Sequence, residues 1–201
     1  MTRGRQGGPP RDLSKFPVRR QERRLWRAAR REPWWYCSDG DCRFDLDAPK
    51  GTCYLGTDEL VGILESIGPE LSNGVVAITF LEQRKLFSWT PRNPLRTADL
   101  VSRRAAGFGA TNELSTMRPY AVPRSWARAF EGAGFAGVTY RSRFDPGATP
   151  RAVAHFGPAG LAKRSSGTGR AIGPDLCTRL ESECGIAVAR PPRLRDLTRA
   201  R

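Results

Sequence analysis

The order of strand-like and helix-like segments constrains this fold more than any other feature of the sequence. The strand-like segments are short, rich in β-branched and aromatic residues, and bounded by Gly or Pro. Helix-like segments interrupt them at irregular intervals, without the steady alternation of a doubly wound parallel sheet. The order predicts an α+β fold. The predicted strands are 51–56, 74–82, 85–90, 137–143 and 152–157, and the predicted helices are 57–68, 97–109, 122–134 and 174–185. The segment 25–31 is strand-like or ambiguous, since its residues also have helical propensity.

The helix predicted over 57–68 has clear end signals. Thr57 is a good N-cap residue, the acidic residues that follow suit the positive end of a helix, and Gly68 can close it. Thr97 is expected to cap the helix over 97–109 in the same way. The segment 163–169 is polar and Gly/Ser-rich, which predicts a flexible connection.

The basic charge is concentrated at the two ends of the chain. The net charge is +14, but residues 1–31 hold 11 Lys or Arg against 2 Asp or Glu, and residues 161–201 hold 9 against 4. The middle of the chain is therefore neutral, unlike a folded domain built to read nucleic acid. We predict a disordered basic arm over 1–22, one domain over 23–160, and a basic extension with one helix over 161–201. Weak contact of the ends with nucleic acid is a secondary expectation.

The sequence predicts no membrane segment, no secretory signal and no metal site. No apolar run approaches the ~20 residues that cross a bilayer, and the N-terminal residues contain no apolar signal core. A cytoplasmic location is therefore expected. The five cysteines form no C-x-x-C pair, and the one histidine lies far from most of them, so buried reduced thiols are expected.

Glu65 lies four residues after Val61 on the predicted helix and borders its apolar face. It can be a solvated glutamate at the edge of that face, or a carboxylate held at the wall of a pocket. Arg27 and Arg43 each precede aromatic residues, a combination that suits a phosphate-bearing ligand with flat rings or simply a surface arginine beside a core. Ser142 has no G-x-S-x-G context and is not expected to be a nucleophile.

Four stretches resemble the RES domain family. They are LWRAARREPWWYCSDGDCRFDLDAPKGTCYLGTDELVGILES (25–66), TADLVSRR (97–104), YAVPRSWARAFEGAGFAGVTYRSRFDPG (120–147) and RAVAHFG (151–157). The resemblance covers roughly residues 23–160. It implies a fold like that of ADP-ribosyltransferases, with a split β-sheet core, flanking helices and a cleft for NAD. It also implies an NAD-degrading toxin, which commonly has a helix-turn-helix antitoxin as its partner.

The resemblance further implies roles for five residues. Glu65, Arg43 and Ser142 would be the catalytic residues, and Arg27, Arg43, Tyr54 and Ser142 would bind NAD. The implied reaction cleaves the nicotinamide–ribose bond, most simply by phosphorolysis to nicotinamide and ADP-ribose 1″-phosphate, with NAD as substrate, phosphate as co-substrate and no resident cofactor. Two alternatives stay open: transfer of ADP-ribose to a macromolecule, and a non-catalytic accessory that binds NAD or nucleic acid.

Overall fold

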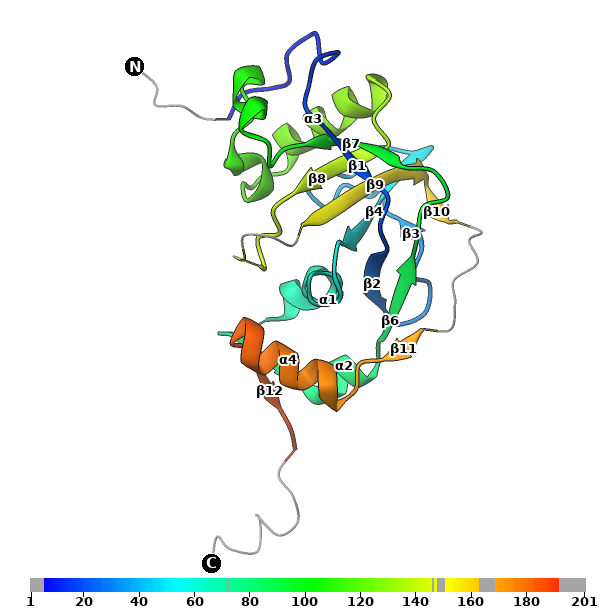
Figure 1. Ribbon diagram of the computed structural model, residues 1–201, viewed down its shortest axis with the longest axis vertical. Helices are drawn as coiled ribbons and strands as arrows, with labels where there is room; N and C mark the ends of the chain where they lie inside the picture. The colour runs from blue at the N-terminus through cyan, green and yellow to red at the C-terminus, as the bar shows by residue number, and fades with distance from the viewer. Residues whose placement is uncertain (1–5, 72, 146, 148–150, 163–168, 192–201) are drawn as a thin grey trace, which may run out of the picture.

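An eight-stranded mixed sheet forms the centre of the computed structural model, which describes residues 6–71, 73–145, 147, 151–162 and 169–191 (Figure 1). The strand order is β1-β7-β8-β9-β4-β2-β6-β11. These strands are β1 (Val18–Gln21), β2 (Leu25–Ala29), β4 (Lys50–Gly56), β6 (Lys85–Trp89), β7 (Leu95–Asp99), β8 (Gly137–Tyr140), β9 (Ala152–Pro158) and β11 (Arg170–Ala171).

Two small sheets and a set of helices surround this centre. The small sheets pair β3 (Trp35–Tyr36) with β10 (Gly160–Leu161) and β5 (Val75–Ala77) with β12 (Ala187–Ala189). The α-helices are α1 (Glu59–Ile67), α2 (Ile78–Glu82), α3 (Ala121–Gly132) and α4 (Pro174–Cys184), and the 3₁₀ helices are η1 (Gly68–Glu70), η2 (Arg103–Phe108) and η3 (Asn112–Ser115). The α+β prediction is confirmed.

The sheet is split between β4 and β2. The antiparallel ladder of β4 with β9 runs over seven residue pairs, but β4 and β2 pair only at Trp26 and Gly56. Helix α1 packs against both strands at this junction. A Cβ at Gly56 would lie 2.2 Å from the backbone nitrogen of Gly62, and a Cβ at Gly62 would lie 2.9 Å from the Trp26 backbone. Two glycines therefore allow α1 to sit at the split.

Separate hydrophobic clusters fill the two halves of the molecule. The larger cluster lies under α3 and contains Phe16, Trp126 and Phe130, all of which are buried. A second cluster joins α1, α4 and α2 below the β2–β6 half of the sheet (Figure 1). Among the described residues, no helix is long and apolar enough to cross a membrane.

The segment 74–82 is not the predicted central strand. Only Val75–Ala77 is extended, and α2 follows immediately at Ile78. Periodicity cannot separate a short apolar strand from a buried helical turn. Here Val76 and Leu81 belong to the second cluster and Ile78 packs against it, while in the described part of the chain β5 pairs with β12 alone, over residues 75–77. The neighbouring elements therefore leave no strand partner for the rest of the segment.

The segment 97–109 is not the predicted helix. Its beginning belongs to β7, which pairs with β1 on one side and β8 on the other. Thr97 is buried, and its hydroxyl donates to the Arg19 carbonyl at 2.8 Å and lies 2.7 Å from the Thr139 hydroxyl. It therefore bridges strands instead of capping a helix, and only Arg103–Phe108 forms a 3₁₀ helix.

Thr57 is also not the N-cap of α1. Asp58 occupies that position, and its Oδ1 accepts a 2.8 Å hydrogen bond from the Val61 amide. The Thr57 hydroxyl accepts instead from the Arg151 amide at 2.8 Å, which joins the start of the helix to the start of β9.

The predicted disordered arm is folded from residue 6 onward, whereas residues 1–5 lie outside the described part. Leu13 and Phe16 are buried, and β1 extends the sheet. The Phe16 ring packs 4.8 Å from that of Phe130, so aromatic burial outweighs the Gly/Pro-rich, basic composition. Much of the N-terminal charge accordingly lies on a folded surface: several arginines of 19–24 line a groove of about 440 Å³.

The described part of the C-terminal extension, residues 161–162 and 169–191, likewise belongs to the folded unit. Helix α4 confirms the predicted helix, and Leu176 and Leu180 bury its apolar face in the second cluster. The predicted flexible connection lies mostly outside the described residues.

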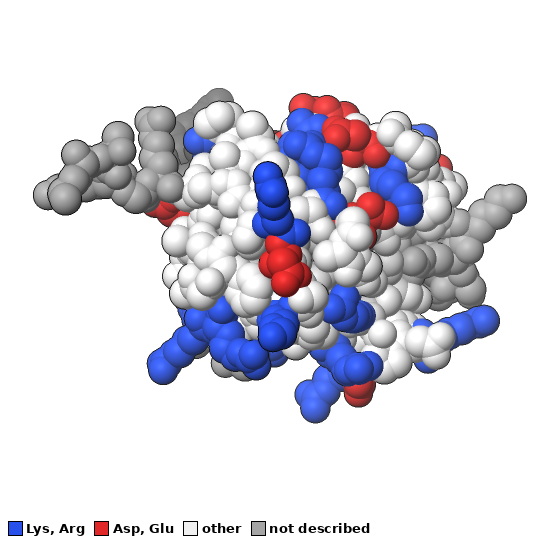
Figure 2. All heavy atoms as spheres, turned by 90° about the horizontal axis from the view of Figure 1, so that it is seen from above, with Lys and Arg blue, Asp and Glu red and all other residues white. Residues whose placement is uncertain are grey.

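Seen from the end that carries α3, basic side chains gather along the lower edge of the view, whereas acidic and basic side chains mix along the upper edge (Figure 2).

Candidate active site

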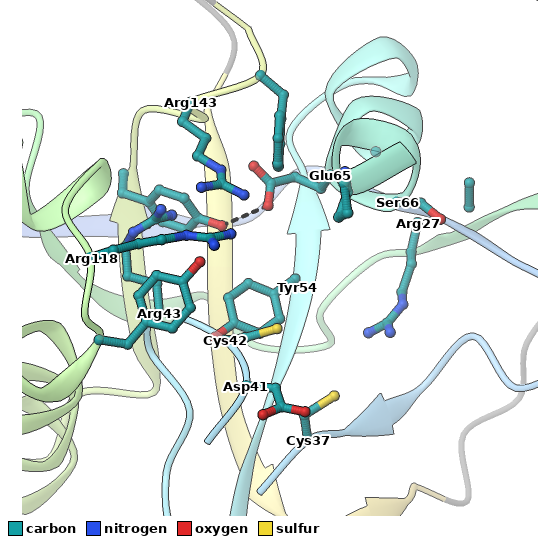
Figure 3. A pocket seen from close by; sticks show the side chains of 16 residues that line it. Arg27, Cys37, Asp41, Cys42, Arg43, Tyr54, Glu65, Ser66, Arg118 and Arg143 are labelled. Carbon is teal, nitrogen blue, oxygen red and sulfur yellow. Dashed lines mark hydrogen bonds between the residues drawn. The ribbon is translucent and has the colours of Figure 1, made fainter. Parts of the chain in front are cut away.

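A cavity of about 380 Å³ opens where the sheet splits. Strands β2, β4 and β8, helix α1 and the loops before β4 and α3 contribute to its wall (Figure 3). The charged and hydrogen-bonding side chains of the lining are Arg27, Cys37, Asp41, Cys42, Arg43, Tyr54, Glu65, Ser66, Arg118, Tyr120, Tyr140 and Arg143. Four of the five residues predicted for the site, Arg27, Arg43, Tyr54 and Glu65, therefore share one cavity.

Glu65 faces this cavity from the last turns of α1. Its Oε2 accepts a 2.9 Å hydrogen bond from the Tyr140 hydroxyl, and it also accepts one from Ser142. Burial raises the pKa of the Glu65 carboxyl, and these two hydrogen bonds and the charges of Arg43 and Arg143 only partly oppose the increase. The carboxylate is thus held at a pocket wall, and the alternative of a solvated edge glutamate is excluded.

Arg43 is a buried cation without a protein partner for much of its guanidinium. Its side chain is only 8% exposed, and its Nε and Nη2 atoms are buried without a hydrogen bond. Such groups cost free energy unless an acceptor reaches them. The guanidinium lies 5.3 Å from the ring centre of Tyr120, which holds it over an aromatic face. An anionic ligand in the cavity would satisfy it.

The two residues after Arg43 anchor the wall behind it. Phe44 is fully buried in the larger cluster, and the fully buried Asp45 accepts hydrogen bonds from the Tyr54 hydroxyl at 2.8 Å and the Cys42 amide at 2.9 Å. The Phe44 amide donates to the same Tyr54 hydroxyl at 2.9 Å. The hydroxyl of Tyr54 is therefore committed to the protein, and its ring is the part that faces the cavity.

Arg27 reaches the cavity from β2, on the opposite side of the split from Tyr54. Its Nη1 donates to the Trp35 carbonyl at 3.2 Å and lies 2.9 Å from Cys53 Sγ. These contacts hold the guanidinium at the cavity, which Arg27 lines together with Glu65 and Arg43.

Ser142 does not line the cavity. It is buried behind Glu65, where its Oγ accepts a 3.1 Å hydrogen bond from the Phe144 amide and its hydroxyl hydrogen-bonds the carboxylate. It is placed to hold Glu65 rather than to touch a ligand, which fits the expectation that it is not a nucleophile.

The lining residues absent from the predicted site include two arginines and two tyrosines: Arg118, Tyr120, Tyr140 and Arg143. Tyr140 had a detectable signal, because it alternates with Val138 and Ser142 along one face of the segment 137–143. Arg118 and Tyr120 had none, since the segment before α3 has no pattern that distinguishes a cavity wall from a surface loop.

The cysteines at the cavity are protonated and free. Burial and the nearby Asp45 raise the pKa of Cys37 to about 11 and that of Cys42 to about 12. All five cysteines are unbridged. Among the residues that the structure describes, no group of three or more His, Cys, Asp or Glu side chains could hold a metal ion.

Comparison with known proteins identifies the family. The sequence profile described as the RES domain matches residues 24–174. The chain belongs to the RES domain family. Among solved structures, a chain of the "M.tuberculosis MbcT-MbcA toxin-antitoxin complex" is similar to this RES protein with a TM-score of 0.55 and 12% sequence identity, over 83% of this chain and 91% of that chain. This likeness supports the fold prediction. Comparison with curated protein sequences found no significant match.

Proposed function

We propose that this RES protein cleaves the bond between nicotinamide and ribose in NAD. The observation that carries the proposal is the presence, in one cavity, of the half-buried Glu65 carboxylate and of Arg43, whose buried Nε and Nη2 atoms have no hydrogen-bond partner. NAD needs both groups: its ribose becomes cationic during cleavage, and its pyrophosphate is anionic. The tyrosine rings supply flat walls for a nicotinamide ring.

Glu65 would stabilise the reacting sugar. Loss of nicotinamide leaves an oxocarbenium-like ribose, as in glycoside hydrolysis, and a fixed carboxylate lowers the free energy of that cation. The hydrogen bonds from Tyr140 and Ser142 hold the carboxylate in place before the reaction. Nicotinamide leaves as a neutral molecule from a cationic state, so no acid has to protonate it.

Arg27 and Arg43 would bind the phosphate-bearing parts of the reaction. A guanidinium offers paired donors that match phosphate oxygens. Tyr54 would bound the nicotinamide side of the pocket with its ring, since its hydroxyl is committed to Asp45. We propose phosphate as the acceptor, which makes the enzyme an NAD phosphorylase; NAD and phosphate would be substrates, with no resident cofactor.

Release of nicotinamide from NAD, with and without inorganic phosphate, tests this function. Wild type should release nicotinamide, and Glu65→Gln should lower the rate at least about a hundredfold, the size of a lost electrostatic group. Glu70→Gln removes an exposed glutamate just after α1 and should leave the rate unchanged. No release by wild type under either condition would overturn the proposal, and labelling of added protein by ADP-ribose would favour the transferase alternative.

The complex that contains the similar structure also supports a partner for this chain. Its description names a toxin and an antitoxin. We propose that this RES protein is the toxin member of such a pair. Growth arrest on expression, relieved by Glu65→Gln, is the expected result; arrest that persists in this variant would contradict an enzymatic toxin.

A further inference from the structure

The arginines of the cavity fall into two groups around Glu65. In Figure 3, Arg43, Arg118 and Arg143 approach the carboxylate from one side, and Arg27 lies on the other. The first group contains three cations that come from separate parts of the chain. Arg43 is buried, Arg143 is half-buried and Arg118 is exposed, and an anion bound among them would offset the repulsion between these like charges.

Tyr120 couples two members of this group. Its ring centre lies 5.3 Å from the guanidinium carbon of Arg43 and 5.4 Å from that of Arg118. Both contacts are within the range of a cation–π interaction. The one ring therefore contacts two guanidinium groups that line the same cavity, and together these groups offer several donors to an anion bound there.

Ion pairs within the described part of the chain do not neutralise this group. None of Arg43, Arg118 and Arg143 forms an ion pair within 4.0 Å of a carboxylate in the described part of the chain. Arg43 and Arg143 still influence the charge of Glu65, because both lower the pKa of its carboxyl. They are therefore near the carboxylate but not bound to it, and two nitrogens of Arg43 are buried without an acceptor.

We propose that Arg43, Arg118 and Arg143 form the subsite for the acceptor phosphate, with Arg118 as the residue that selects phosphate over water. The inference rests on the proposed cleavage of NAD. An acceptor must reach the anomeric carbon that Glu65 serves, whereas the NAD pyrophosphate is separated from that carbon by the ribose. The group beside Glu65 therefore suits the acceptor, and Arg27, on the other side, suits the pyrophosphate.

The step balances without a further reactant. A phosphate oxygen forms a bond to the anomeric carbon, the bond from that carbon to the nicotinamide nitrogen breaks, and its electron pair neutralises the pyridinium. The products are neutral nicotinamide and ADP-ribose 1″-phosphate, and nothing is oxidised or reduced. The arginines would hold the phosphate dianion in place and offset its repulsion from the Glu65 carboxylate.

Steady-state kinetics with both substrates varied provide the test. Arg118→Gln should raise the KM for phosphate at least about tenfold, as expected for one lost charged hydrogen bond, and leave the KM for NAD within about twofold. Arg27→Gln should show the reverse pattern. Arg128→Gln, an exposed arginine on α3 that pairs with Asp47 outside the cavity, is the matched control and should change neither. An equal effect of Arg118→Gln on both KM values, or none on that for phosphate, would overturn the inference.

Direct binding of inorganic phosphate separates this inference from the proposed function. Titration calorimetry without NAD should detect phosphate binding to wild type and to Arg128→Gln, and at least about tenfold weaker binding to Arg118→Gln. If phosphate binds in this way but no nicotinamide is released, the subsite stands as an anion site and the proposed reaction fails. If nicotinamide is released but phosphate neither binds nor accelerates the reaction, the reaction stands and the subsite is overturned.

Discussion

The hydroxyl of Tyr140, the last residue of β8, donates a 2.9 Å hydrogen bond to Oε2 of Glu65 on α1. The two residues are 75 positions apart, and the bond joins the strand layer to the helix at the split of the sheet. It stabilises the ionised carboxylate, whose pKa burial raises. The bond therefore sets both the orientation of Glu65 and the pH range in which it carries charge.

Tyr140→Phe should shift the acidic side of the pH–activity profile for NAD cleavage to higher pH. The variant removes a hydrogen bond that favours ionised Glu65, so the pKa of the carboxyl rises further above its usual value. Activity requires the ionised form and is lost as the pH falls through that pKa. A shift of about one pH unit corresponds to the loss of one such bond. The rate of nicotinamide release, measured as a function of pH, checks this shift. An unchanged pH profile in a Tyr140→Phe variant that is folded and active would contradict this role.

Glu65→Gln should stabilise the protein at neutral pH. The folded-state pKa of Glu65 is raised, so ionisation at higher pH costs folding free energy, and this cost disappears as the pH falls through that pKa. The gain in melting temperature should be largest near pH 8 and should shrink on acidification. Each kcal/mol gained in the free energy of unfolding corresponds to roughly 2–4 °C. Thermal unfolding at several pH values measures it, with Glu70→Gln as the exposed control. A gain that grows on acidification would reverse the assigned sign.

Asp45→Ala should destabilise the fold by about 2–4 kcal/mol, because it leaves the Tyr54 hydroxyl and the Cys42 amide without their buried acceptor. Asp47→Ala is a close control two residues away. Asp47 forms ion pairs with Arg124 and Arg128 at the surface, so its loss should cost at most about 1 kcal/mol. Urea unfolding compares the two, and equal losses would show that Asp45 is not the anchor of the cavity wall.

Gly62→Ala should loosen the contact between α1 and β2. The added Cβ would lie 2.8 Å from the Trp26 Cβ and 2.9 Å from its backbone, so the helix must shift at a cost of about 1–3 kcal/mol. Gly132→Ala, at the end of α3, meets nothing within 4 Å and should be neutral or stabilising by up to about 1 kcal/mol. Chemical denaturation of both variants is the measurement; a stable Gly62→Ala protein would mean that the split tolerates a wider gap.

Local patterns determined much of this protein. The helices at α1, α3 and α4 follow from end signals and apolar spacing within each segment, and the strands at β4, β6, β8 and β9 follow from their composition. Motif resemblance added the residues of the site, and the structure brings Glu65, Arg43, Arg27 and Tyr54 into one cavity. These features depend on a few neighbouring residues, which is the range over which a sequence pattern carries information.

The tertiary structure decided what depends on distant partners. Thr97 lies in a strand because β1 and β8 flank it, and Leu13 and Phe16 fold because aromatic rings from α3 cover them. Arg118 is part of the cavity only because the loop before α3 reaches the split of the sheet. A segment's own residues do not encode which strand pairs with it or which cation faces a distant carboxylate. Those contacts arise only when the whole chain buries its apolar surface at once.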